Sequence, residues 1–107
     1  MIYAINLTYT STSEAINACL DAHKEWLIHH LSAERILFAG PLEDKAGGFI
    51  LAFGSSLSEI EQMLAADPFV AHGLVRTDIL ATQPALRAAN FSGVWAAAAK
   101  PISPGSA

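Results

Sequence analysis

The sequence has few of the groups on which several classes of protein depend. It has one cysteine, Cys19, which excludes an intrachain disulfide and suits a reducing cytoplasm. Its six Lys and Arg residues are scattered singly, so they form no basic stripe for nucleic-acid phosphates. No apolar run approaches the ~18 residues of a membrane span, and the N-terminus lacks the features of a signal peptide. We therefore expect a cytoplasmic protein with neither a nucleic-acid nor a membrane partner.

What the chain does have is apolar residues. Hydrophobic residues make up 52% of its 107 residues and charged residues only 15%, which is typical of one folded domain rather than a disordered chain. A domain of this size has little spare surface on which to place so many apolar side chains. We therefore expect a second copy of the chain to cover part of them, in a homodimer.

The first half of the chain predicts a strand, a long helix and a hairpin. Residues 2–9 alternate and are rich in β-branched and aromatic residues, as in a strand. A capping box at Ser11–Glu14 predicts a helix that runs to about residue 31. Strands are expected over residues 35–39 and 49–53, close enough in sequence to form a hairpin.

The second half predicts a helix, a single helical turn and a last strand. A capping box at Ser58–Glu61 predicts a helix that stops near Ala66. Asp67 and Pro68 are the residues preferred at an N-cap and at the first helical position, so a short turn follows. The last strand is expected over residues 74–82.

The resulting order, βαββαβ, predicts an α+β ferredoxin-like fold. Its right-handed crossovers give a four-stranded antiparallel sheet with two helices on one face. The other face has no helix to cover it, so we expect the second copy to pack there, sheet on sheet. We assign residues 1–85 to this domain. Residues 86–107 form a C-terminal extension that packs either on its own domain or on the partner subunit.

The helix expected over residues 11–31 has a histidine on its buried face. The apolar positions of that face recur at helical spacing: Ile16, Leu20, Leu27 and Leu31. His23 falls in the same series, three residues after Leu20 and four before Leu27. The residues expected on the solvated side are Asp21, Lys24 and Glu25.

A buried imidazole needs a partner for its N–H group, and we predict that Asp67 supplies it. This topology packs the two helices on the same face, and Asp67 directly follows the second one. A carboxylate would fix the tautomer of His23 and leave the other ring nitrogen free to move a proton. Two simpler alternatives stay open. His23 could bond a backbone carbonyl in the core, and Asp67 could only cap the turn that begins at Pro68.

Four further residues are predicted to form a substrate pocket around this pair: Trp26, Pro41, Phe69 and His72. Trp26 and Phe69 would supply apolar walls, unless they are only core residues. Gly40-Pro41 is first of all a turn signal, and His72 lies on the turn after Asp67.

No metal site is expected. His30 lies seven residues after His23 on the same helix face, about 10 Å away, which is too far for both to bind one ion. His29 is expected to be solvated near the end of the helix. Cys19 lies one helical turn before His23, where a small buried thiol and a Cys-His nucleophile pair are both conceivable.

This set of residues resembles the YCII (YciI-like) family. The matching elements are His23, Trp26-Leu27, Gly40-Pro41-Leu42, Gly47-Gly48, Asp67-Pro68-Phe69 and Gly73-Leu74. The resemblance implies a dimeric ferredoxin-like α/β barrel with a His-Asp pair, carried over as His23 and Asp67. One line similar to this group removes chloride from a chlorinated hydroxyquinol. The family often has an arginine shortly before the histidine, whereas residues 17–20 here carry no cation.

The leading hypothesis is a small enzyme that needs no metal or organic cofactor. His23 would act as general base or acid on a small cyclic or aromatic metabolite, in a lyase-like or isomerase-like reaction, and Asp67 would orient it. The alternative is a non-catalytic dimeric protein that binds a small molecule in the same pocket. A third hypothesis is a relative of haem-degrading monooxygenases, with His23 as the iron ligand.

Overall fold

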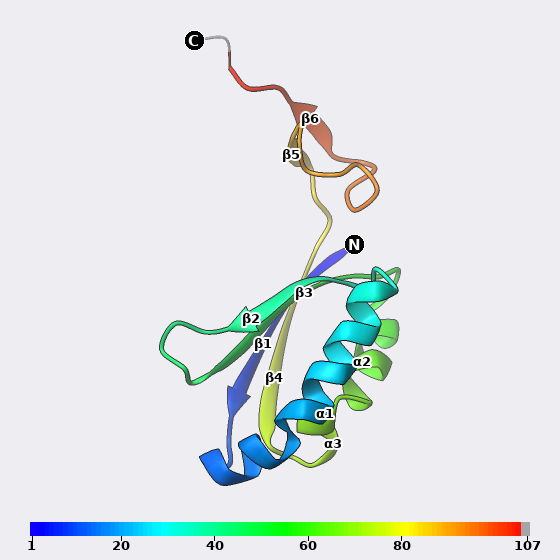
Figure 1. Cartoon of the computed structure of the whole chain (residues 1–107). Coiled ribbons are helices and arrows are strands. Elements are labelled where there is room, and N and C mark those ends of the chain that lie inside the picture. The colour runs from blue at the N-terminus through cyan, green and yellow to red at the C-terminus, as the bar shows by residue number, and fades with distance from the viewer. Residues whose placement is uncertain (106–107) are drawn as a thin grey trace.

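The computed structural model describes residues 1–105 as a βαββαβ domain followed by a short extension (Figure 1). Residues 106 and 107, the end of the predicted extension, lie outside the described residues. The elements in chain order are β1 (Ile2–Tyr9), α1 (Ser13–Ser32), β2 (Ile36–Pro41), β3 (Gly47–Phe53), α2 (Leu57–Ala65), α3 (Pro68–Ala71), β4 (Val75–Thr82), β5 (Leu86–Ala88) and β6 (Lys100–Ile102).

The main sheet has four strands in the order β2-β3-β1-β4, and all three pairings are antiparallel. The first strand is therefore central, and the helices lie together on one side of the sheet (Figure 1). The predicted ferredoxin-like fold is confirmed. No helix within residues 1–105 is both long and apolar enough to cross a membrane.

The core lies between the sheet and the helices, because alternate side chains of each strand point to that side. Its buried members are Tyr3, Ile5, Leu7, Trp26, Ile36, Ile50, Ala52, Ile60, Met63 and Leu64. Strand register places Tyr3 opposite Ala52 and Ile5 opposite Ile50, so the core continues from β1 to β3.

The opposite face of the sheet carries an apolar row that no helix covers. Phe38, Leu51, Ala4 and Leu80 are cross-strand neighbours in that order across all four strands. Phe38 is 54% exposed and Leu80 is 74% exposed. We call these four residues the apolar row.

Both long helices begin at residues other than those predicted. Thr12, not Ser11, is the N-cap of α1, and its hydroxyl accepts from the Ala15 N–H group at 3.2 Å. Ser56, not Ser58, caps α2. Several hydroxyl residues precede each helix, and the one that caps it is the one whose extended backbone aims its oxygen at a free N–H group.

The buried face of α1 is also rotated from the prediction. Its buried residues are Ile16, His23, Trp26 and His30. Leu31 is exposed, and Leu20 and Leu27 are only half-buried. Trp26 and Leu27 are adjacent apolar residues, and the larger ring takes the central position because it buries more apolar area. His23 lies on the buried face in either phase.

The hairpin of β2 and β3 is longer than predicted, because Pro41 and Gly47 belong to the strands. Pro41 is tolerated since β2 is an edge strand, where a missing N–H group breaks no ladder bond. Gly47 is required by close packing, because a Cβ atom placed there would lie 1.8 Å from the Leu7 carbonyl oxygen.

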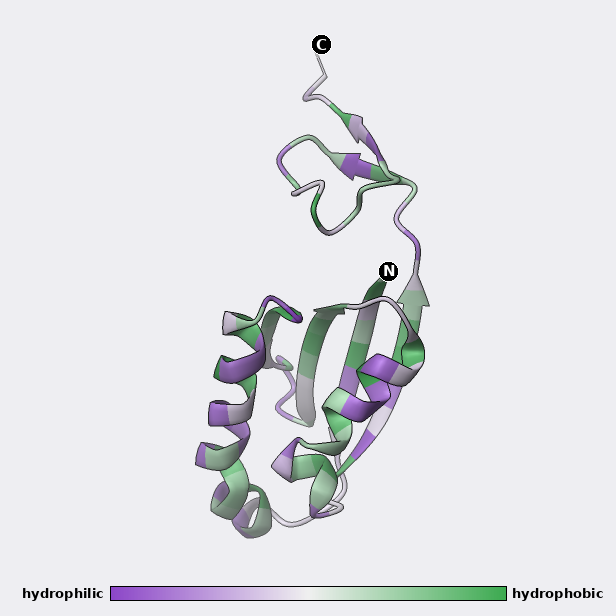
Figure 2. Cartoon of the chain, turned by 90° about the vertical axis from the view of Figure 1, so that its right-hand side faces the viewer, coloured by the Kyte–Doolittle hydropathy of each residue, from purple (hydrophilic) through white to green (hydrophobic). Residues whose placement is uncertain are grey.

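The extension leaves the end of β4 and projects beyond the sheet (Figures 1 and 2). It contains a short parallel pair, β5 and β6. Residues 96–99 are helix-prone in sequence but do not form a helix. The Trp95 ring meets Phe53 edge-on at 5.5 Å, so the extension contacts its own domain.

We predict that Gly47→Ala destabilises the protein by about 1–3 kcal/mol, because the new Cβ atom forces β1 and β3 apart. Urea denaturation measures the change in the free energy of unfolding. Gly40→Ala is the matched control on the same hairpin, since nothing lies within 4 Å of a Cβ atom there. Equal stability of the two variants would contradict the packing role of Gly47.

Candidate functional site

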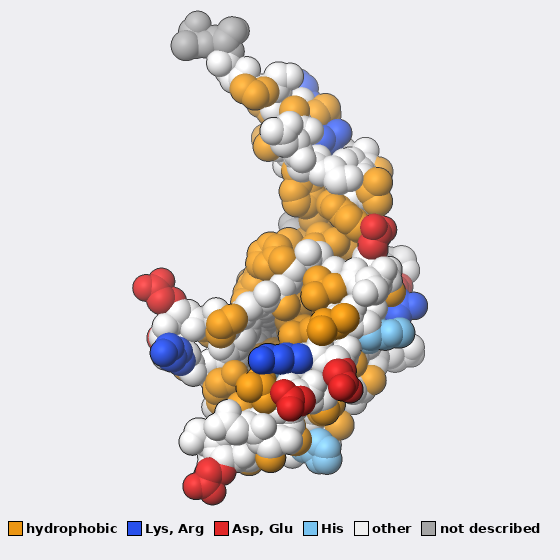
Figure 3. Space-filling view, viewed as in Figure 1, with side chains coloured by type: hydrophobic (Ala, Val, Ile, Leu, Met, Phe, Trp, Pro, Cys, Tyr) orange, Lys and Arg blue, Asp and Glu red, His pale blue; other side chains and the backbone are white. Residues whose placement is uncertain are grey.

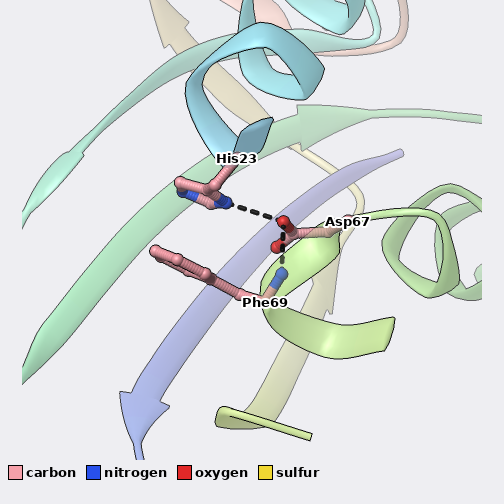
Figure 4. A network of polar contacts seen from close by, with 3 residues as sticks. All are labelled: His23, Asp67 and Phe69. Carbon is pink, nitrogen blue, oxygen red and sulfur yellow. Dashed lines mark hydrogen bonds and ion pairs between the residues drawn. The ribbon is translucent and has the colours of Figure 1, made fainter. Parts of the chain in front are cut away.

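His23 and Asp67 meet where α1 packs against α3 (Figure 4). The Nδ1 atom of His23 lies 2.7 Å from Oδ1 of Asp67. The histidine is 8% exposed and the aspartate 0% exposed, so the contact is shielded from water. The predicted contact is present, and the alternative in which a backbone carbonyl satisfies His23 is wrong.

Asp67 also caps α3, so its two proposed roles are not exclusive. Its Oδ1 accepts from the Phe69 N–H group at 3.1 Å, as well as from His23. One carboxylate oxygen can accept two hydrogen bonds because it has two lone pairs. Oδ2 is fully buried and accepts no hydrogen bond from residues 1–105. The cap fixes the carboxylate, and the fixed carboxylate orients the imidazole.

Aromatic packing fixes the plane of the imidazole. The Phe69 ring stacks on it with centroids 3.9 Å apart and planes 9° apart (Figure 4). Trp26 lies further away, at 6.0 Å. Because an ionised carboxylate only accepts, the neutral imidazole carries its proton on Nδ1 and leaves the Nε2 lone pair unprotonated.

The pair lies beside an open cavity of about 430 Å³ between α1 and the β2–β3 hairpin. Figure 3 shows mainly hydrophobic side chains around this side of the molecule. Of the four predicted pocket residues, Pro41 and Phe69 line the cavity, as His23 does. The remaining lining residues are Leu7, Tyr9, Leu20, Lys24, Leu27, Ala39, Gly40, Gly48, Phe49 and Ile50.

Two predicted pocket residues do not line the cavity. Trp26 is a core residue that packs under the helix, because the buried face of α1 is centred on it. His72 is exposed at the C-cap of α3, where the chain turns away toward Gly73. The left-handed backbone at Gly73, with φ +67°, directs the chain into β4 rather than toward the cavity.

Sequence analysis missed Tyr9 and Lys24 as lining residues. Tyr9 is the last residue of β1 and meets Phe69 edge-on at 6.0 Å. Lys24 is exposed, as predicted, but it also borders the cavity. It follows His23 directly, and one residue along a helix is a rotation of about 100°, which reaches the edge of the buried face. Only the position of the hairpin shows that this edge borders a cavity.

Among residues 1–105, no group of three or more His, Cys, Asp or Glu side chains is arranged to hold a metal ion. Cys19 is half-buried and packs against the buried cluster of Ile16, Phe69 and Leu74. It is not among the residues that line the cavity.

A family model described as the YCII-related domain matches residues 1–82. The chain belongs to the YCII family. The match contains both members of the His-Asp pair and every cavity-lining residue. No curated protein sequence matches this YCII chain at a significant level.

A solved structure of similar fold is 5-chloro-2-hydroxyhydroquinone dehydrochlorinase from Burkholderia phenoliruptrix, in complex with 2,5-dihydroxybenzoquinone. It is 24% identical in sequence, with a TM-score of 0.66. The match covers 78% of this YCII chain and 95% of that one.

His30 is a second buried imidazole on α1, outside the cavity. Its Nδ1 atom lies 3.4 Å from the Arg35 guanidinium, so it serves as an acceptor in the neutral form. Burial lowers the pKa of His30 from its ordinary value of 6.5, and the nearby His29 and Arg35 lower it further. The protonated form is thus disfavoured in the folded protein.

We predict that His30 makes stability fall as the pH drops below 6.5. Between the ordinary pKa of 6.5 and the lowered pKa of the folded protein, His30 is protonated in the unfolded chain but neutral in the folded protein. Protonation in this pH range therefore favours unfolding. The contribution is present above the ordinary pKa of 6.5 and is lost as the pH falls through the lowered pKa of His30. Urea unfolding of His30→Gln across this range should show a shallower fall, with the exposed His72→Gln as control. If the free energy of unfolding of His30→Gln fell with pH as steeply as that of the native protein, this role of His30 would be contradicted.

Proposed function

We propose that the protein is a small-molecule enzyme in which His23 acts as general base and acid, and Asp67 orients it. The observation that carries the proposal is the 2.7 Å contact between Nδ1 and Oδ1 beside an apolar cavity. A buried carboxylate on one ring nitrogen leaves the other nitrogen to exchange a proton with a bound ligand. Pro41 and Phe69 are proposed as substrate-contacting walls.

The proposed cycle moves one proton. Neutral His23 takes a proton from an O–H or C–H bond of the substrate onto Nε2, and the substrate keeps the electron pair of that bond. Asp67 then stabilises the imidazolium. His23 returns the proton either to another atom of the same molecule, which is an isomerisation, or to solvent after a leaving group departs, which is an elimination.

The likeness to the dehydrochlorinase supports the elimination as the first reaction to assay. Loss of chloride from a chlorinated hydroxyhydroquinone requires that a base remove a proton while chloride leaves with the electrons of the C–Cl bond. We propose small cyclic or aromatic hydroxy compounds as the substrate class. Chloride release from 5-chloro-2-hydroxyhydroquinone is the direct test, and His23→Gln should reduce it by ~10²–10⁴-fold.

The tautomer of His23 tests the proposed pair without any substrate. We predict that neutral His23 is protonated on Nδ1 in the native protein, because Asp67 can only accept there. In Asp67→Ala no acceptor remains at Nδ1, so the preference for a proton on that nitrogen should be lost and the tautomer protonated on Nε2 should appear. Long-range ¹H–¹⁵N NMR spectra distinguish the two tautomers.

Asp78→Ala is the matched control, because it removes an exposed carboxylate whose ion-pair partner within residues 1–105 is Arg76. Its His23 tautomer should be that of the native protein. A proton on Nε2 in the native protein would contradict the proposed base. Retained ligand binding with no turnover in any assay would favour the non-catalytic binding protein.

We also propose that two copies pack through the apolar row. Four apolar side chains in register on an uncovered sheet face form a surface that a second sheet can bury, in a symmetric sheet-on-sheet interface. Residues 1–85 are proposed as the domain that carries this face and the cavity. Residues 86–107 are proposed as an accessory extension, described up to residue 105.

We predict that Leu80→Lys converts the homodimer to a monomer, because it places a charge in the proposed interface. Light scattering gives the mass directly. Leu57→Lys is the matched control, since Leu57 is 48% exposed but lies on α2, on the helical side. A native protein of monomeric mass would overturn the proposed dimer.

A further inference from the structure

We infer that the cavity selects a planar cyclic compound that carries one negative charge, and that the ammonium group of Lys24 binds this charge. The charged group would be a phenolate, an enolate or a ring carboxylate. The inference deepens the proposed function, because it names the substrate class of the same site. Its basis is the side-chain chemistry of the cavity wall.

Among residues 1–105, few polar side chains line the cavity, and the only formal charge among them is positive. Three lining residues have polar side chains, namely Tyr9, His23 and Lys24. No Asp or Glu residue is among the lining residues, and Asp67 is shielded from the cavity at 0% exposure. The wall therefore carries the fixed charge of one ammonium group.

This positive charge stands out against the rest of the protein. The chain has a net charge of −4, so most of its surface disfavours an anion. In the part of the chain that the structure describes, no carboxylate pairs with Lys24. Asp21 and Glu25 are exposed on the same helix, but neither lies within ion-pair distance of the exposed Lys24 ammonium group, so this group can bind a ligand anion. The apolar walls also lower the local dielectric constant and strengthen that attraction.

The shape of the cavity favours a flat ring. One wall is the backbone of the hairpin, where Ala39, Gly40 and Gly48 have little or no side chain. The facing wall is α1, which contributes Leu20 and Leu27. A ring between these walls can contact apolar atoms on both faces. A volume of about 430 Å³ is within the range usual for small-molecule sites.

Lys24 and His23 are consecutive residues of α1, and both line the cavity. When His23 removes a proton from a hydroxyl or carbon of a cyclic substrate, negative charge develops on the ring. A fixed cation in the same cavity stabilises that charge.

Binding of benzoate and benzamide tests the inference, because these probes have nearly the same shape and differ by one charge. We predict that the native protein binds benzoate about tenfold or more tightly than benzamide, as measured by ligand-observed NMR. Lys24→Met should remove the preference, and Lys24→Arg should keep it. Added salt should weaken benzoate binding and leave benzamide binding unchanged.

Lys100→Met is the matched control, because it removes the same charge from the exposed strand β6 of the extension. It should keep the preference for benzoate. Equal binding of the two probes, binding of neither, or a preference that survives in Lys24→Met would overturn the inference. The proposed catalysis is tested separately. If turnover were unaffected in His23→Gln while the native protein still preferred benzoate, the catalytic role of His23 would be wrong and the anion preference would stand.

Discussion

The interaction on which the rest of the site depends is the burial of the Asp67 carboxylate at 0% exposure. A buried carboxylate is costly unless hydrogen bonds and an opposite charge compensate for lost water. Here the Phe69 N–H group and His23 Nδ1 both approach Oδ1. One bond comes from the turn that Asp67 caps, and the other comes from α1, so the carboxylate links two helices. Replacing either donor would leave a buried charge short of partners.

The fold makes this contact possible through local sequence features. Pro68 follows Asp67 and has no N–H group to satisfy, so the carboxylate can serve the Phe69 N–H group instead. Gly73 follows the turn with a left-handed backbone, and β4 begins two residues later. The ferredoxin-like topology brings α1 alongside. Stacking of Phe69 on His23 then sets the plane of the ring that the carboxylate orients.

Sequence reasoning predicted what short-range patterns determine and missed what depends on tertiary packing. Alternation identified the strand at residues 2–9 without error, and Asp67-Pro68 gave the cap and the turn. The predicted buried face of α1 was rotated from the observed one, because the adjacent apolar residues Trp26 and Leu27 cannot both lie at the centre of that face. His72 was wrongly placed near the cavity, since sequence distance from Asp67 does not give the direction of the chain. The β5–β6 pair is too short to show a period.

The cavity residues that were missed have a common physical cause. A side chain at the edge of a helix face is solvated or lines a cavity according to what lies opposite, and the opposite element here is a hairpin more than ten residues away along the chain. The hairpin contributes Ala39, Gly40 and Gly48, which have little or no side chain, and this leaves a space between its larger side chains and α1. His23, which a buried carboxylate orients, and Lys24 both line that space. The sequence places these two residues one step apart on a helix, and only the opposing hairpin makes them neighbours of the same cavity.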